Sequence, residues 1–199
     1  MKIYLNILLI LFCNFVFAQD LPVLSTTSLA NPEHDLENAK NGNYAKDVNN
    51  ERDAYVGFWE YRQNGITFQL KIEKKDKVLN KIEHDGQISN YNFFDKLILK
   101  YKLIKNGNIL FDNLNDIYID ESVCWGVKQS SRDLYGRLLD HTRNVVGSYI
   151  IEKISGNPNK LNFKLTLGNY RLLNSKEYYA DGQPLFSIPT DGIEMVKIN

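Results

Sequence analysis

The sequence predicts an all-β domain, an antiparallel barrel or closed-up sandwich of about 8–10 strands preceded by a short helix. Three observations predict it. Apolar and polar residues alternate with a period of two in several segments after Gly57, which is typical of strands with one buried face. Asn-Gly and Asp-Gly pairs that favour tight hairpin turns separate these segments. No strand–helix–strand rhythm is present, so a parallel sheet is not expected.

Composition and charge exclude several classes of protein. The chain has 199 residues, of which 43% are hydrophobic and 12% aromatic, and its 24 basic residues balance 24 acidic ones. These values are close to the average of globular proteins and exclude collagen, coiled coils and polytopic membrane proteins. The absence of a basic excess argues against a nucleic-acid partner. The length indicates one domain with tails.

The first element, residues 1–18, has the features of a secretory signal peptide. Lys2 precedes a run that is apolar apart from two asparagines, and Ala18 offers a small residue for cleavage. The run is too short to span a bilayer comfortably, so we expect no transmembrane span after cleavage. Phe12 before Cys13 does not fit a lipoprotein signal, so lipid anchoring is the less expected route. We expect an exported protein that is periplasmic, envelope-associated or secreted, with Cys124 as its remaining cysteine.

The next elements are a linker and a helix. Residues 19–43 contain few bulky apolar side chains and are expected to form a flexible linker. From residue 44 to residue 199 we expect a single β-barrel-like domain. Tyr44, Val48 and Tyr55 follow a spacing that fits a short amphipathic helix over residues 44–55, which Asn43 could cap.

The strands follow from the alternating segments. Residues 66–72, 97–103 and 161–167 alternate most clearly, and the pairs Asn64-Gly65, Asp85-Gly86 and Asn106-Gly107 are expected to form turns. Residues 132–139 are the only segment after Gly57 with any helical spacing. Further short strands are expected at residues 117–119, 123–127, 145–151 and 193–198.

Candidate chemistry is sparse, and we predict that the protein is not an enzyme and has no cofactor. His34, His84 and His141 have no metal-ligand spacing, and each is expected to be solvated. Cys124 is expected to be a small buried hydrophobic residue, although a nucleophilic role with His141 would require the two to meet in the fold. The acidic residues Asp112, Asp116, Asp120 and Glu121 lack the spacing of a calcium loop.

The motif Gly57-Phe58-Trp59 resembles the G-x-W opening of lipocalins and fatty-acid-binding proteins, which form calycin-like barrels. The resemblance implies a lipocalin-like barrel in which Trp59 closes one end and packs on the last strand. Gly57 and Trp59 are therefore expected to be structural residues, and Trp125 is a third residue expected to be structural. The resemblance carries over no ligand-binding residue, because no other motif of those families is present.

A second resemblance extends over most of the chain. The motifs that carry it run from Asp47-Val48-Asn49-Asn50-Glu51 through Tyr55-Val56-Gly57-Phe58-Trp59 to Ile188-Pro189-Thr190. They resemble a small exported family of unknown function from Bacteroidetes, whose members usually read Gly-Thr-Trp-Lys where this chain has Gly57-Phe58-Trp59-Glu60. The resemblance implies an exported, lipocalin-like domain with no catalytic residue.

Two functions remain open at this stage. The protein could be a non-catalytic interaction or structural module of the cell envelope that contacts an envelope protein through its outer face. Alternatively, it could be a lipocalin-like binding protein for a small apolar or amphipathic ligand. The ligand would then be lined by Phe68, Leu70, Tyr101 and Phe163. A bare strand edge or an exposed apolar patch would favour the first function, and an interior filled by its own side chains would count against the second.

Overall fold

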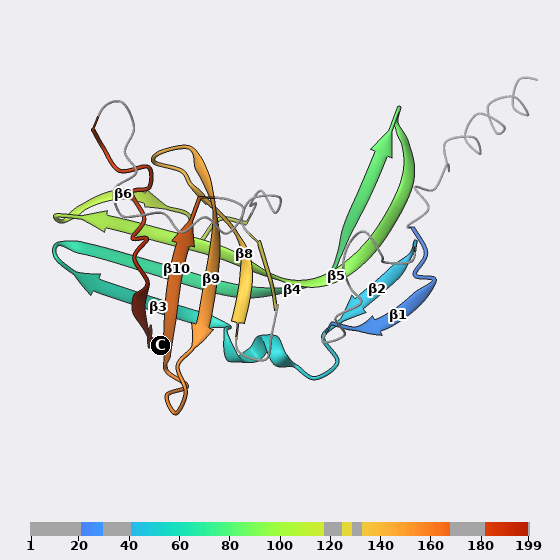
Figure 1. Cartoon of the computed structure of the whole chain (residues 1–199), viewed down its shortest axis with the longest axis horizontal. Helices are drawn as coiled ribbons and strands as arrows, with labels where there is room; N and C mark the ends of the chain where they lie inside the picture. The colour runs from blue at the N-terminus through green and yellow to red at the C-terminus, as the bar shows by residue number, and fades with distance from the viewer. Residues whose placement is uncertain (1–20, 30–40, 118–124, 129–132, 168–181, 199) are drawn as a thin grey trace, which may run out of the picture.

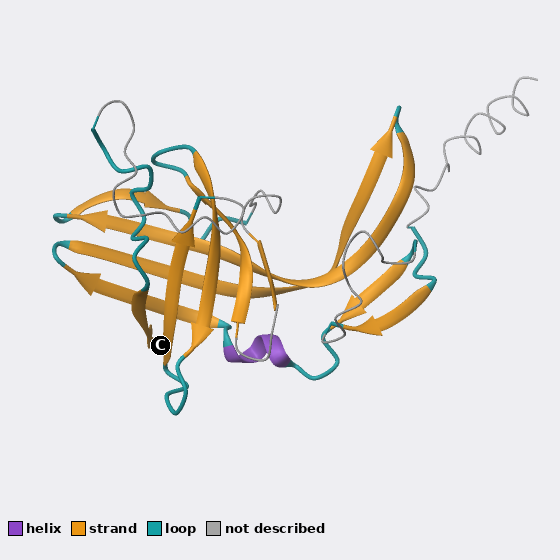
Figure 2. Ribbon diagram, viewed as in Figure 1, coloured by secondary structure: helices purple, strands orange, loops and turns teal. Residues whose placement is uncertain are grey.

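The fold is built almost entirely of strands. A computed structural model describes residues 21–29, 41–117, 125–128, 133–167 and 182–198. Within these residues one turn of 3-10 helix, η1 (Glu51–Ala54), interrupts the β structure (Figure 2). The strands are β1 (Ser25–Ser28), β2 (Asn43–Lys46), β3 (Gly57–Gln63), β4 (Ile66–His84), β5 (Gln87–Lys105), β6 (Asn108–Asp112), β7 (Trp125–Lys128), β8 (Asp133–Asp140), β9 (Val145–Lys153), β10 (Lys160–Thr166) and β11 (Ile193–Ile198).

All described strands belong to one sheet that curls on itself. Its order is β1-β2-β5-β4-β3-β11-β10-β9-β8-β7, with β6 paired to β5. β7, the last strand in this order, pairs with β5 through two residue pairs, Leu97 with Gly126 and Ile98 with Trp125. β7 therefore meets β5 over a short ladder and is not joined to it along a full strand length, so the described sheet is not a closed barrel. The predicted all-β class is confirmed.

The curled sheet and the apolar core on its concave side together form what we call the body. Alternate residues of seven strands point inward, as the period of two predicts. Trp59, Phe68 and Tyr101 are completely buried, and Tyr55 joins them from the turn that precedes β3. The core therefore combines residues that are far apart in the sequence.

The long hairpin of β4 and β5 leaves the body beyond the bulge at Asp76 and Lys77. We call this outer part of the hairpin the arm. The arm rises away from the barrel-like body, and β1 and β2 lie against its base (Figure 1). A β-bulge marks the transition: Lys75 pairs with Lys96 and Val78 with Phe94, so Asp76 and Lys77 together oppose one residue. Lys77 has a φ of 53°, which bends the strand at this point.

The structure corrects three expectations. Residues 44–55 are not a helix but the parallel strand β2 followed by η1, because pairing with β5 outweighs the helical spacing. Val48 is 54% exposed, so the three spaced residues share no buried face. The expected linker over residues 19–43 contains strand β1. Residues 132–139, the segment with helical spacing, fall in strand β8 where they are described.

The clear alternations and the turns are confirmed. Strands β4, β5 and β10 contain nearly all of the three alternating segments, and β9 and β11 match two of the shorter predictions. The first residue of each predicted turn, Asn64, Asp85 and Asn106, has a φ of 51°. Ile117 lies outside any strand, whereas 118–119 and 123–124 lie outside the described residues.

Candidate functional site

The residues expected to line a ligand pack against one another. Phe68 lies with its ring centroid 5.8 Å from that of Tyr101 and 5.4 Å from that of Phe163. Leu70 is fully buried in the same core. All four side chains thus belong to one buried core, in which Phe68 packs against Tyr101 and Phe163.

The expected structural tryptophan is part of the buried core. The indole Nε1–H of Trp59 donates to the carbonyl oxygen of Tyr55 at 2.7 Å, and the side chain is fully buried. Gly57 has a φ of 127°, and a Cβ at this position would lie 2.9 Å from the Cε of Lys197. Trp125 pairs through its backbone with Ile98, and its side chain lies outside the described part of the chain.

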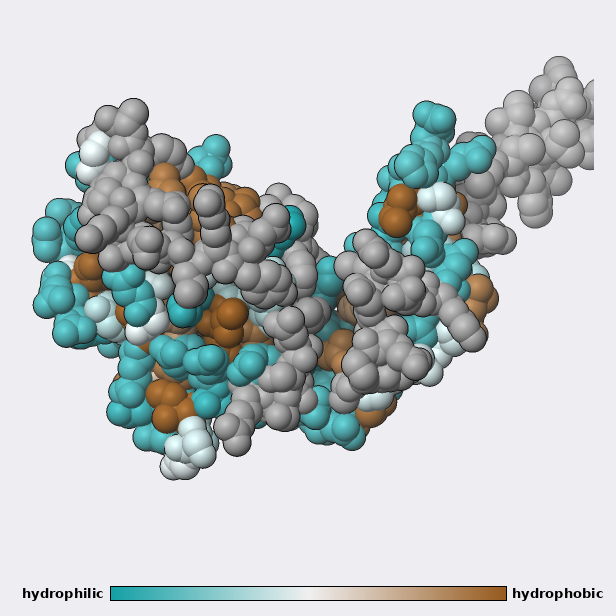
Figure 3. Space-filling view, viewed as in Figure 1, coloured by the Kyte–Doolittle hydropathy of each residue, from teal (hydrophilic) through white to brown (hydrophobic). Residues whose placement is uncertain are grey.

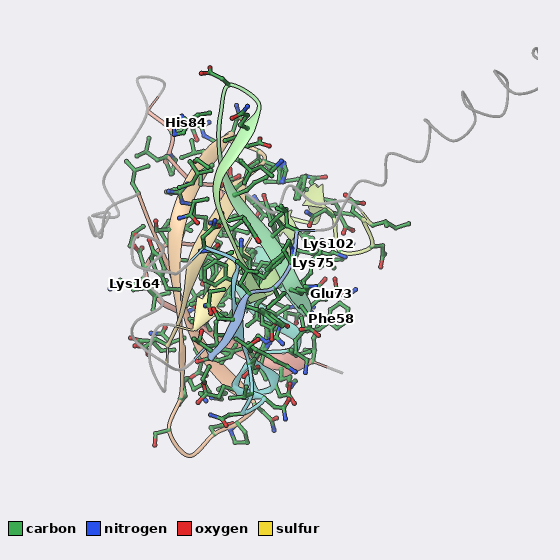
Figure 4. The ribbon with its side chains drawn as sticks, turned by 90° about the vertical axis from the view of Figure 1, so that its right-hand side faces the viewer. Phe58, Glu73, Lys75, His84, Lys102 and Lys164 are labelled. Carbon is green, nitrogen blue, oxygen red and sulfur yellow. The ribbon has the colours of Figure 1, made fainter. Side chains whose placement is uncertain are left out.

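The histidine and cysteine candidates do not assemble into a site. His84 is exposed near the tip of the arm (Figure 4). His141 stacks on Phe111 at 4.2 Å, and burial lowers its pKa, although nearby Asp140 opposes that shift. His34, Cys13 and Cys124 lie outside the described residues.

The acidic run is not a metal site where it is described. Asp112 pairs with Lys102 at 2.8 Å, and the backbone N–H of Asp116 donates to the carbonyl of Asn113. Asp120 and Glu121 lie outside the described residues. Within the described ranges no group of three or more His, Cys, Asp or Glu side chains is arranged to hold a metal ion.

A buried charge cluster instead lies where the arm leaves the body. The guanidinium of Arg52 contacts Asp47 through Nε at 2.9 Å. Through Nη2 it contacts Asp76 at 2.7 Å and Asp95 at 3.3 Å. Its Nη1 donates to the carbonyl oxygen of Lys96 at 3.0 Å. The arginine therefore fills the space between the three carboxylates and joins η1 to both strands of the bulge.

The hydrogen bonds around this cluster fix the protonation of its members. Burial alone would raise the pKa of Asp47, but hydrogen bonds from Arg52 and from the backbone N–H of Glu51 and Arg52 lower it below its usual range. Tyr44 donates its hydroxyl to Asp95 at 2.6 Å, and burial together with this carboxylate raises the pKa of Tyr44. Asp47 and Tyr44 therefore keep their usual charge near neutral pH, and the cluster connects the base of the arm to the body.

The outer edge of the arm lacks a strand neighbour among the described residues. β3 pairs with β4 only as far as Ile72, so Val78–His84 have a described strand neighbour on one side only. The direction of the open backbone groups follows from Tyr91, which faces Lys81 in the ladder. The N–H of Tyr91 donates to Asn41 and its carbonyl accepts from Gly42, so both groups point away from β4.

The backbone direction of Lys81, which faces Tyr91, follows from that of Tyr91. In an antiparallel ladder two facing residues either share both hydrogen bonds or share neither. The N–H and carbonyl of Lys81 therefore point outward, and by alternation so do those of Leu79. The arm thus presents backbone donors and acceptors in the arrangement that an added strand needs.

Apolar side chains flank this edge on both faces. Leu79 is 40% exposed, Ile82 51% and Ile88 38%. Apolar surface is visible on the arm among its polar side chains (Figure 3). Lys81 and Glu83 pair with each other at 2.6 Å, which leaves the edge without net charge.

The sequence matches a known family along almost its whole length, over residues 1–197. The chain belongs to the family of unknown function DUF6705. The predicted membership in a family without an assigned activity is therefore confirmed. Comparison with curated proteins and with solved structures gives no match.

Sequence reasoning missed the residues that organise this site. Arg52 is one of many charged surface-type residues in the sequence, and no local pattern marks it as buried. Asp140 is fully buried and accepts a hydrogen bond from the backbone N–H of Ile188 at 3.1 Å. No sequence pattern marked this residue as buried either. The predicted alternating segment ended at residue 72, whereas strand β4 continues through the charged residues 73–77 into the arm. Among the described residues there is no helix with the length and hydrophobicity needed to cross a membrane.

Proposed function

We propose that this protein is an exported, non-catalytic interaction module of the cell envelope, which receives a strand of a partner protein along the outer edge of the arm. The observation that carries the proposal is the one-sided ladder at Val78–His84, with the backbone groups of Leu79 and Lys81 directed outward. Addition of a strand to such an edge is a common mode of peptide recognition, in which main-chain hydrogen bonds supply affinity. The apolar, signal-peptide-like start of the sequence supports export.

The position of the arm supports the same function. The hairpin projects from the body, so a partner can approach the edge without meeting the body (Figure 1). The buried Arg52 cluster holds the base of the arm in one orientation. A rigid edge loses less conformational entropy when a partner binds than a mobile one does.

The side chains along the edge indicate what the partner strand should look like. Ile82 and Leu79 point to opposite faces and offer apolar contacts on both. Lys81 disfavours self-pairing about its own position, since two ammonium groups would then face each other. We therefore expect a different protein with a strand of mixed apolar and polar residues.

The ligand-barrel alternative receives no comparable support. The four candidate lining residues are fully buried in one apolar core, where Phe68 packs against Tyr101 and Phe163. A ligand pocket of ordinary size would need some 300–1,000 Å³ of space bounded by such side chains. The arm is therefore the better candidate for function.

Site-specific photo-crosslinking in cells that produce the full chain tests the proposal. A benzophenone amino acid at Ile82 should give one discrete adduct with a different protein, whereas the same group at Val196, which is similarly exposed on β11, should not. The variant Lys81→Pro should abolish the adduct without unfolding the protein, because it removes an outward N–H and no bond to β5. An adduct at twice the chain's own mass, no adduct at Ile82, or an adduct that survives Lys81→Pro would overturn the proposal.

A further inference from the structure

A second surface feature lies on the body, away from the outer edge of the arm. A cavity of about 560 Å³ is lined by the end of η1, the turn between β9 and β10, and the strands β10 and β11. Its lining includes the lysines Lys153, Lys160 and Lys197, and no aspartate or glutamate. The cavity is therefore a site of concentrated positive charge on a chain whose total charge is balanced.

Two of the three lysines have no acidic partner in the described part of the chain. Lys160 pairs with Glu194 on the neighbouring strand. Lys153 instead places its ammonium 5.3 Å from the ring centre of Tyr55, and Lys197 places its own 5.2 Å from that of Trp59. These cation–π contacts position the two ammonium groups without neutralising their charge.

The backbone around the cavity is ordered by its own hydrogen bonds. The N–H of Lys197 donates to the carbonyl oxygen of Asn159 at 2.8 Å, which joins β11 to the turn. The N–H of Asn159 donates to the side-chain oxygen of Asn157 at 3.1 Å. Gly57 leaves the space that the side chain of Lys197 occupies, since a Cβ there would lie 2.9 Å from its Cε. These bonds fix the backbone that carries Lys160 and Lys197 at the border of the cavity.

We propose that this cavity binds a phosphate-bearing group, which Lys153 and Lys197 hold by charge and Lys160 approaches from the rim. Lysine is a compact charge with three donors, and it recognises phosphate through charge more than through fixed geometry. The cavity exceeds the size of inorganic phosphate and has room for the group to which a phosphate is esterified. That group can belong to a soluble phosphate monoester or to the headgroup of an anionic lipid.

Titration of the full-length protein with defined probes tests this assignment. Glycerol phosphate is the soluble probe, and vesicles of phosphatidylglycerol, with phosphatidylcholine vesicles as the reference, are the membrane probe. We expect saturable binding of at least one probe at low ionic strength, with phosphatidylcholine vesicles bound at least tenfold more weakly than phosphatidylglycerol. Binding of glycerol phosphate alone would identify a soluble ligand, and binding of phosphatidylglycerol alone a lipid headgroup.

Matched variants separate the cavity from general surface charge. Lys153→Gln with Lys197→Gln should weaken binding at least tenfold, whereas Lys164→Gln, further along β10, should change it less than twofold. Lys197→Arg keeps the charge and should retain most of the binding. Circular dichroism and thermal melting establish that each variant is folded. Absence of saturable binding to both probes, or an equal loss in the Lys164→Gln variant, would overturn the proposal.

Discussion

Removing the guanidinium of Arg52 should release the arm from the body. In Arg52→Leu the side chains of Asp47 and Asp95 would remain buried without their counter-charge, and these carboxylates are only 2% and 3% exposed. Breaking a buried ion pair by removing one partner costs about 3–5 kcal/mol, because the remaining charge stays desolvated. Asp76 is 68% exposed and adds less than about 1 kcal/mol. We therefore expect a loss of about 3–5 kcal/mol in the free energy of unfolding.

Chemical denaturation combined with hydrogen exchange measures both the size and the location of this effect. The N–H groups of Asp47 and Lys77, which donate to Asp95, should lose protection first. The amides of β9 and β10 should keep theirs until global unfolding, because the cluster lies at the arm and not in the core. The variant Asp76→Asn is the control and should lower stability by less than about 1 kcal/mol.

Two results would refute this reasoning. The first is an Arg52→Leu protein as stable as Asp76→Asn, which would show that the cluster does not hold the arm. The second is an equal loss of protection in the arm and in β10, which would show that the arginine supports the whole sheet. The Asp76→Asn control, which neutralises only the exposed carboxylate, distinguishes these outcomes from a general effect of charge.

Three further predictions concern the core and pH. Trp59→Ala should destabilise by about 3–5 kcal/mol in chemical denaturation, and a variant that melts like the parent would contradict its place in the core. The lowered pKa of Asp47 contributes stability above about pH 4 that is lost as the pH falls through the depressed value, so Asp47→Asn should flatten the acid limb of the stability curve. Because the pKa of His141 is lowered in the folded protein, stability should fall as the pH drops below about 6.5, and His141→Gln should remove that dependence. An unchanged pH profile in the Asp47 or the His141 variant would be evidence against the pKa shift of that residue.

The sequence predicted the parts of the fold that local patterns determine. The alternation around Phe68, Tyr101 and Phe163 has the period of a half-buried strand, and all three side chains point into the core. The Asn-Gly and Asp-Gly turns carry their own conformational signal at Asn64 and Asp85. The burial of Trp59 agrees with the Gly57-Phe58-Trp59 motif, from which a structural role of this tryptophan was expected.

What the sequence could not predict depends on partners distant in the chain. β2 forms because Tyr44 and Ala45 meet Phe93 and Phe94 about fifty residues later, and only the folded chain brings them together. The burial of Arg52 depends likewise on Asp95 and on the carbonyl of Lys96. The arm continues through a charged run, where hydrophobic periodicity predicts no strand. The open edge is a property of sheet order, which no single segment encodes.

Amide hydrogen exchange at Lys81 is the most direct test of whether the arm receives a partner strand. It should be measured in the free full-length protein and in the complex isolated natively from the producing cells. In the free protein the amide of Lys81 should exchange rapidly while those of Asn80 and Ile82 are protected by bonds to β5. In the complex, exchange at Lys81 should slow by at least a hundredfold. Protection of Lys81 in the free protein, or no change in the complex, would contradict strand addition at this edge.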